Sequence, residues 1–161
     1  SSFGNFDPEN GIKFLQKINS SMKNDDLFLI GLDLVKDKTV LRQAYDDSQG
    51  ITAQFNLNVL SRINSELGGN FDISKFVHYA VYNENQNKIE MYLRSLAKQT
   101  VEIPNANLML EIDEGELIHT EDSHKYTISQ IKQMFEMTGY QIEAMWNDEN
   151  KYYSLVLLSK K

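Results

Sequence analysis

The chain of 161 residues contains no cysteine. This absence excludes disulfide frameworks, thiol nucleophiles and zinc sites built from thiolates. No apolar run reaches the roughly 18 residues that a membrane-spanning helix needs, so we expect no membrane partner. Residues 1–10 also lack the basic start and apolar stretch of a secretory signal peptide. Together these absences fit a reducing compartment, and we expect a cytoplasmic protein.

Basic residues are scarce as well. Sixteen lysines and arginines stand against 23 aspartates and glutamates, which gives a formal net charge of -7. Nucleic-acid-binding proteins usually present a basic face to the phosphate backbone, so this composition argues against a nucleic-acid partner. Hydrophobic residues at 41% and charged residues at 24% are ordinary for a globular protein. The length suits one domain, or one domain that carries a modest insertion.

The first 36 residues have the pattern of a helix followed by a strand. Asp7 can cap a helix that starts at Pro8, because proline suits the first helical position. Residues 27–34 (LFLIGLDL) form a nearly continuous apolar run. Such a run is typical of a strand buried on both faces, as in a parallel sheet. Asp33, near the end of this run, is expected to orient the linker that follows.

The middle of the chain changes character. Residues 38–45 and 53–67 predict two helices, and the second ends at Gly68. In the second helix, apolar side chains recur at helical spacing: Phe55, Val59, Leu60, Ile63 and Leu67. From Phe76 onward, apolar and polar residues alternate, which predicts an antiparallel sheet with one wet face and a turn at 83–87.

Beyond Tyr126 the helix–strand character returns. Residues 128–138 predict a helix that Gly139 ends, and residues 140–146 and 152–158 predict an antiparallel hairpin. The overall pattern is therefore α/β, then an α+β piece, then α/β again.

Two stretches, 44–58 and 119–126, combine polar and aromatic side chains more densely than a core helix or a solvated loop requires. These two stretches, together with Gly4-Asn5-Phe6 and Ile89-Glu90-Met91, give four blocks whose order along the chain is that of a known protein family. On these blocks the chain resembles the C-terminal half of the histidine-specific, S-adenosylmethionine-dependent Nα-methyltransferases, which make trimethylhistidine on the route to ergothioneine. The resemblance covers essentially all 161 residues.

The resemblance implies a substrate site for L-histidine. The family's substrate asparagine in the Gly-Asn-Phe element matches Asn5, and its tyrosine before Asp-Asp matches Tyr45. The Glu-x-Ser pair that grips the imidazole matches Glu121 and Ser123. Further positions of the pocket wall match Thr52, Phe55 and Met91. The resemblance implies no metal and no residue that bonds covalently to the substrate.

Without the resemblance, plainer interpretations of the same residues stay open. Glu121 is a solvated surface acid, Asn5 shapes the turn into the first helix, and Tyr45 is half-buried packing. His78 is a structural or surface residue, and a metal site at Glu121 with its flanking histidines is a minor alternative. Asp46-Asp47 suggests a helix-ending turn or cap rather than a catalytic pair, because neighbouring helical residues do not face each other.

The chain departs from the family pattern in one large respect. The glycine-rich strand–turn–helix that holds S-adenosylmethionine is missing, and Gly68-Gly69 ends a helix instead. We therefore expect residues 1–36 and 126–161 to be parts of a class I (Rossmann-like) methyltransferase domain, with residues 37–125 as an inserted α+β substrate-binding domain. The cofactor would be bound mainly by an N-terminal half, so this piece alone is expected to be inactive.

Two other functions remain open at this point. One is a stand-alone module that binds an amino acid or a protein, and the other is a methyltransferase for a different amine. A truncated sheet would expose apolar edges, so a dimer through those edges is also expected.

Overall fold

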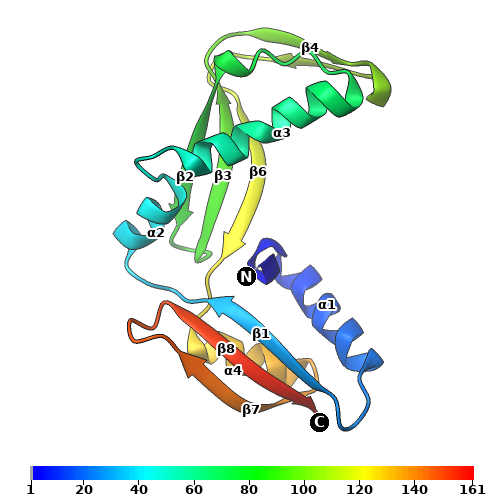
Figure 1. The fold of residues 1–161 in the computed structure, drawn as a ribbon, viewed down its shortest axis with the longest axis vertical. Coiled ribbons are helices and arrows are strands. Elements are labelled where there is room, and N and C mark those ends of the chain that lie inside the picture. The colour runs from blue at the N-terminus through cyan, green and yellow to red at the C-terminus, as the bar shows by residue number, and fades with distance from the viewer. Residues whose placement is uncertain (1) are drawn as a thin grey trace. The chain divides into compact units, whose positions relative to one another are not determined.

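A computed structural model describes residues 2–161, and the chain divides into two compact units (Figure 1). Unit 1 comprises Ser1–Lys38, Asn83–Ile89 and Asp122–Lys161. Unit 2 comprises Thr39–Tyr82 and Glu90–Glu121. Each unit has a hydrophobic core of its own.

Unit 1 is a small α/β assembly. Its elements are η1 (Ser2–Asn5), α1 (Pro8–Ser21), β1 (Leu27–Asp33), α4 (Ile128–Met137), β7 (Tyr140–Asn147) and β8 (Tyr153–Lys160). The strands form an antiparallel sheet in the order β1-β8-β7. Leu15 of α1 and Phe135 of α4 are fully buried in the same core as Leu32 and Leu158 of the sheet. The two helices therefore cover one face of the sheet.

Local signals set the helix boundaries in unit 1, and both predicted helices are confirmed. The Asp7 carboxylate accepts a hydrogen bond from the Asn10 backbone N–H, with Pro8 as the first helical residue. At the start of α4, Thr127 and Gln130 form a reciprocal capping box. The closing hairpin is confirmed as well, because β7 and β8 pair antiparallel.

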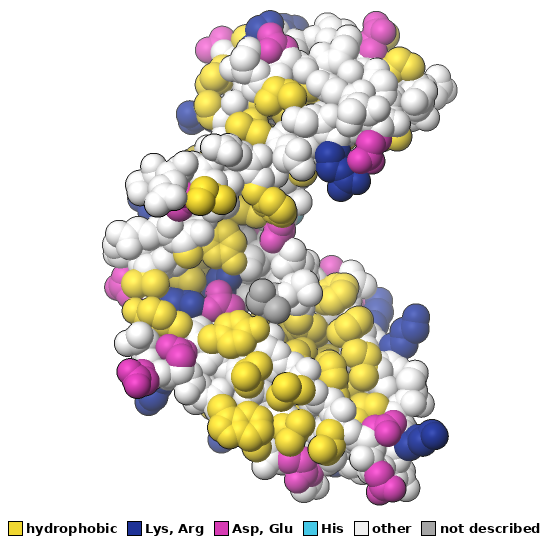
Figure 2. Space-filling view, in the orientation of Figure 1, with side chains coloured by type: hydrophobic (Ala, Val, Ile, Leu, Met, Phe, Trp, Pro, Cys, Tyr) yellow, Lys and Arg dark blue, Asp and Glu magenta, His cyan; other side chains and the backbone are white. Residues whose placement is uncertain are grey.

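The prediction that β1 is buried on both faces, as in a parallel sheet, is wrong for the described part of the chain. β1 pairs antiparallel with β8, and the side chains of Leu27 and Leu29 are 60% and 56% exposed. They lie on the face opposite the helices, together with the exposed Trp146 and Leu155. Figure 2 shows hydrophobic side chains gathered over this sheet. An apolar run signals hydrophobic faces, but it does not reveal whether both are covered.

The remaining elements lie wholly or mainly in unit 2. These are α2 (Lys38–Tyr45), α3 (Ile51–Leu67), η2 (Ile73–Lys75), β2 (Phe76–Asn83), β3 (Lys88–Ser95), β4 (Gln99–Ile103), η3 (Pro104–Ala106), β5 (Leu108–Ile112) and β6 (Leu117–His124). Of these, β3 and β6 each extend into unit 1 at one end. One sheet has the order β2-β3-β6, and β4 pairs antiparallel with β5 in a second. The four-residue turn between β2 and β3 requires them to run antiparallel.

The two predicted helices of this region are confirmed. Gly68 ends α3 in the left-handed conformation (φ 71°), which glycine adopts without a steric penalty. The apolar stripe of α3 divides between core and surface, since Leu60 is buried whereas Phe55 and Val59 are exposed. In β3 the predicted alternation is also confirmed: Met91 and Leu93 are buried between more exposed neighbours. Among residues 2–161, no helix has the length and apolarity to cross a membrane.

Candidate functional site

Glu121 and Ser123 both belong to β6 and stand two residues apart on the strand. The Glu121 side chain is partly buried, and no residue in the described range 2–161 forms a hydrogen bond or ion pair with its carboxylate. Glu121 is therefore available to accept a hydrogen bond from a ligand.

The sequence neighbours of Glu121 hold this part of β6 in place. The Thr120 hydroxyl donates a hydrogen bond to the Met91 carbonyl on β3 at 3.0 Å. On the other side of Glu121, Asp122 forms an ion pair with Lys88 of β3 at 2.7 Å, with both side chains largely buried. These contacts fix the strand on either side of the carboxylate.

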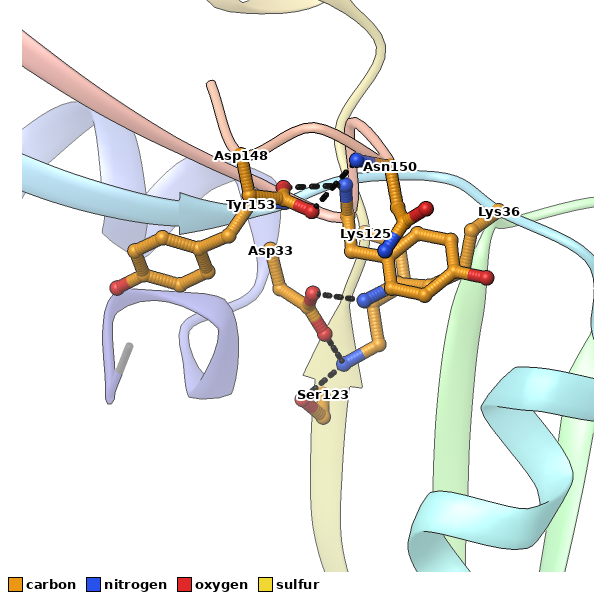
Figure 3. Close-up of polar contacts among 8 residues, drawn as sticks. Asp33, Lys36, Ser123, Lys125, Asp148, Asn150 and Tyr153 are labelled. Carbon is orange, nitrogen blue, oxygen red and sulfur yellow. Dashed lines mark hydrogen bonds and ion pairs between the residues drawn. The ribbon is translucent and has the colours of Figure 1, made fainter. Parts of the chain in front are cut away.

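Ser123 is held by a buried lysine. The Lys125 ammonium donates to Ser123 Oγ at 2.8 Å and pairs with Asp33 Oδ2 at 2.8 Å (Figure 3). The Lys125 side chain is completely buried, whereas the Asp33 side chain keeps 21% of its surface exposed. A buried ammonium requires a compensating carboxylate, and Asp33 supplies it.

Asp33 also serves the linker, as the sequence predicted. Its other oxygen pairs with Lys36, and the Lys36 ammonium lies 5.0 Å from the centre of the Tyr152 ring. Backbone hydrogen bonds join the same segments: Tyr126 N–H donates to the Asp33 carbonyl at 2.9 Å, and Val35 N–H donates to the Tyr126 carbonyl at 3.0 Å. The end of β1 and the residues after β6 are thus joined by main chain and by charge.

The segment that carries Asn5 lies against the end of β6 within unit 1. A Cβ atom placed on Gly4 would lie 2.9 Å from the His124 carbonyl oxygen and 3.7 Å from Ser123 Oγ. Any larger residue at position 4 would push η1 away, so Gly4 allows the close approach. Asn5, the next residue, is exposed, and its side chain has no hydrogen-bond partner among residues 2–161. Unit 1 therefore brings Asn5 and Ser123 into the same neighbourhood.

In unit 2, His78 fixes the position of Tyr45. The His78 Nε2–H donates to the Tyr45 carbonyl at 2.7 Å, since a carbonyl oxygen can only accept. The Asn56 amide, 2% exposed, donates to His78 Nδ1 at 2.9 Å and to the Tyr92 carbonyl at 3.0 Å. The imidazole is therefore a neutral structural link from β2 to α2 and α3, which confirms the structural interpretation of His78.

Asp47 caps α3 rather than forming half of a catalytic pair. Its carboxylate accepts backbone hydrogen bonds from Thr52 at 2.8 Å and Ile51 at 2.9 Å. These bonds, with that from Thr52 the largest contribution, lower the pKa of Asp47 to about 2. The prediction of a structural cap in the Asp46-Asp47 dipeptide is confirmed.

The three expected wall residues have different environments. Met91 is 3% exposed on β3, Thr52 is partly buried in the first turn of α3, and Phe55 is 66% exposed one turn later. Phe55 borders a shallow surface hollow along α3 with Val59 and Arg62. The structure thus places Thr52 and Phe55 on the same helix and Met91 on a sheet strand of the same unit.

The other two histidines have separate roles. The His119 ring contacts Tyr92 edge-to-face at 5.2 Å between centroids. His124 borders a cavity of about 300 Å³ in unit 1, and burial of the ring lowers its pKa. Its Nε2 has no hydrogen-bond partner among residues 2–161. Among residues 2–161, no cluster of three or more histidine and acidic side chains is arranged to hold a metal ion.

Sequence reasoning missed Lys125, and it missed the Asn56 amide behind Tyr45. A signal for Lys125 exists in the sequence, because Glu121, Ser123 and Lys125 alternate with other residues in an extended segment. A period of two places such residues on one side of a strand.

The family sequence model that describes the histidine-specific, S-adenosylmethionine-dependent methyltransferases matches residues 1–160 of this chain. The chain belongs to this family. It is 38% identical to the histidine N-alpha-methyltransferase of Mycobacterium tuberculosis over 160 residues. The aligned region covers 99% of this chain and 50% of that protein.

Two more distant relatives carry different names. Ergothioneine biosynthesis protein 1 of Schizosaccharomyces pombe is 27% identical, with 99% of this chain and 21% of that protein covered. The L-tryptophan methyltransferase of Psilocybe serbica is 25% identical, with 98% of this chain and 44% of that protein covered. The chain thus spans half or less of the length of these relatives.

The His78 link predicts a specific stability effect in unit 2. Asn56→Ala leaves His78 Nδ1 and the Tyr92 carbonyl without their buried donor, and should lower the free energy of unfolding by about 1–3 kcal/mol. Asn58→Ala, on the exposed side of the same helix, should change it by less than about 0.5 kcal/mol. Urea unfolding followed by circular dichroism checks this, and equal effects of the two changes would contradict the role given to Asn56.

Proposed function

We propose that the full-length protein containing this chain methylates the α-amino nitrogen of L-histidine with S-adenosylmethionine as methyl donor. This chain contributes residues that recognise the amino acid. The observation that carries the proposal is the partly buried Glu121 carboxylate, which has no partner among the described residues although β6 is fixed on either side of it. The resemblance of the chain to histidine N-alpha-methyltransferases supports the same assignment.

The proposed roles follow from the hydrogen-bonding capacity of each group. Glu121 accepts an imidazole N–H, and the Ser123 hydroxyl bonds the other ring nitrogen. Asn5 carries both a donor and an acceptor, so it can bond the substrate carboxylate and amine. Tyr45 donates to the carboxylate through its phenol. Thr52, Phe55 and Met91 are proposed as wall residues of the histidine site.

Methyl transfer from a sulfonium to an amine requires a neutral amine held in line with the methyl group. Positioning of this kind lowers a barrier by as much as about 7–11 kcal/mol. The role proposed for these residues is therefore orientation of the amino acid rather than proton transfer or covalent catalysis.

The described residues do not fit S-adenosylmethionine itself. Residues 2–161 contain no glycine-rich loop between a strand and a helix, and the one pair of adjacent glycines, Gly68-Gly69, ends α3. We accordingly assign no cofactor contact to this chain.

We further propose that residues 1–36 and 126–161 belong to a class I methyltransferase domain and that residues 37–125 are a substrate-binding insert. The division of the chain into two units supports the general arrangement. One segment differs, because residues Asn83–Ile89 at the end of the β2–β3 hairpin belong to unit 1.

A different amino-acid acceptor is the second candidate. The family relative from Psilocybe serbica, named for L-tryptophan, favours tryptophan as the acceptor to compare. An indole can donate its N–H to Glu121, but it offers no ring nitrogen that accepts a hydrogen bond.

The decisive experiment is a methyl-transfer assay on the full-length protein with labelled S-adenosylmethionine and either L-histidine or L-tryptophan. Glu121→Ala should lower kcat/KM for histidine by about 10- to 100-fold, because it removes a charge-assisted hydrogen bond. Glu114→Ala, which changes an exposed acid in the turn before β6, is the matched control and should have no effect.

Transfer to histidine that is insensitive to Glu121→Ala would remove the imidazole-reading role. Transfer to tryptophan alone would favour the second candidate. No transfer to either, with intact folding, would favour a binding module.

We also propose that the 161-residue chain pairs with a second copy through the free edge of β1. Within the described residues, β1 has a strand neighbour on one side only, and its Leu27 and Leu29 are exposed. Unprotected apolar edges favour strand pairing between chains. Light scattering should give twice the chain mass, and Leu29→Lys should give a monomer. A monomeric parent chain would contradict this proposal.

A further inference from the structure

We propose that unit 1 contains a ligand site, separate from the proposed histidine site, for a small aromatic molecule that carries an amine and a hydroxyl group. The site is the cavity that His124 borders together with residues of α1 and α4. All of the residues that line it belong to unit 1. The inference does not depend on the proposed function, because it uses none of the residues assigned to histidine recognition.

The cavity lies beside the His124 face of β6 rather than the Ser123 face. These two residues are neighbours on the strand, and successive side chains of a strand point to opposite faces. The His124 ring borders both the cavity of about 300 Å³ and a second hollow of about 450 Å³. The two spaces adjoin, because they share four further lining residues: Asp7, Pro8, Gln86 and Gln130. Volumes of this size are typical of small-molecule sites.

The His124 ring is suited to bond a hydroxyl group. Neither of its nitrogens has a hydrogen-bond partner among residues 2–161. Burial of the ring lowers the pKa of His124, so the imidazole is neutral near pH 7. A neutral imidazole has one N–H donor and one acceptor nitrogen, and a hydroxyl can bond to either. A ligand hydroxyl therefore matches this ring whichever nitrogen carries the proton.

The charged groups of the lining favour an amine over an acid. The Lys125 ammonium is paired with Asp33 at 2.8 Å. The Lys88 ammonium is paired with Asp122 at 2.7 Å. Asp7, in contrast, has no lysine or arginine within ion-pair distance among residues 2–161. The lining thus carries an uncompensated negative charge, which the ammonium group of a ligand would balance.

Asp7 keeps hydrogen-bonding capacity although it caps α1. Its Oδ1 accepts a bond from the Asn10 backbone N–H at 2.8 Å, and its Oδ2 accepts one from the Asn10 side chain at 2.6 Å. These bonds, with that from the backbone the largest contribution, lower the pKa of Asp7, so the group is ionised near pH 7. A carboxylate offers about four lone-pair sites, so about half remain for a ligand.

The walls of the cavity favour an aromatic body. The rings of Phe3 and Tyr126 lie 5.9 Å apart between centroids, and both line the cavity. Met134 and Met137 of α4 line it as well. Methionine sulfur makes favourable contacts with aromatic rings, and its flexible side chain adapts to the shape of a ligand. These four side chains supply the apolar surface, whereas His124 and Asp7 supply the polar contacts.

A titration of the full-length protein with tyramine tests the site, because tyramine combines an aromatic ring, a hydroxyl and an amine. NMR signals of methyl-labelled methionines report where it binds. The signals of Met134 and Met137 should shift saturably, with a Kd of about 1 mM for so small a ligand. Met109 is the control, since its side chain is 64% exposed like that of Met137 but belongs to unit 2. Its signal should not shift.

Two further probes separate the polar contacts. Phenethylamine lacks the hydroxyl and should bind about tenfold more weakly than tyramine, which is the effect of one lost hydrogen bond. 4-Hydroxyphenylacetate has a carboxylate in place of the amine, and it should bind about fivefold more weakly because Asp7 repels it.

Variants assign each contact to its residue. His124→Phe should remove the advantage of tyramine over phenethylamine, because the ring nitrogens are gone. Asp7→Asn should remove the advantage of tyramine over 4-hydroxyphenylacetate, and it should fold because asparagine also caps helices. Asp25→Asn, which changes an exposed acid of unit 1 outside the cavity, should leave both advantages unchanged. Should His124→Phe not fold, the Asp7→Asn comparison still decides between a specific and a non-specific site.

The outcomes are distinct from those of the methyl-transfer assay, because the titration contains no S-adenosylmethionine. Saturable shifts of Met134 and Met137 with the expected probe preferences support the site. No saturable shift up to about 10 mM tyramine overturns it, and this is the result expected if the cavity holds only water. Equal shifts of Met109 and Met137 overturn it too. Displacement of tyramine by L-histidine would assign the binding to the substrate site and would also overturn the inference.

Discussion

A buried ammonium must be neutralised, and this requirement organises the part of the molecule around β6. Lys125 has no exposed side-chain surface, so it depends on Asp33 at the end of β1 for its counter-charge. Meeting that requirement joins a strand near the start of the chain to one more than 80 residues later. The same ammonium also donates a hydrogen bond to Ser123, which holds that side chain at the end of β6.

In unit 2, buried polar side chains also hold a proposed contact residue in place, but these side chains are neutral. There the buried Asn56 amide and the His78 ring hold the Tyr45 backbone, without any charge to compensate. Two of the proposed contact residues, Ser123 and Tyr45, are thus each held by the side chain of another residue. Rigid support of this kind matters for methyl transfer, because small displacements of a bound substrate reduce the rate steeply.

The sequence predicted those features that depend on local chemistry. The start of α1 at Pro8 and the Asp47 cap follow from short-range hydrogen bonding, and both are confirmed. Features that depend on contacts between distant segments could not be predicted from the sequence. Leu29 lies on an exposed face because nothing in the described chain covers it, and no periodicity reveals that. Lys125 was missed because a single lysine normally indicates a solvated surface, and only its distant partner Asp33 makes burial possible.

The central claim of the proposed function is that the Glu121 carboxylate accepts a hydrogen bond from the imidazole of bound L-histidine. The most direct measurement is the nitrogen NMR spectrum of L-histidine labelled at both ring nitrogens and bound to the full-length protein. The account predicts a signal from a protonated ring nitrogen that shifts in Glu121→Gln. A ring spectrum that is the same in the parent and in Glu121→Gln would contradict it.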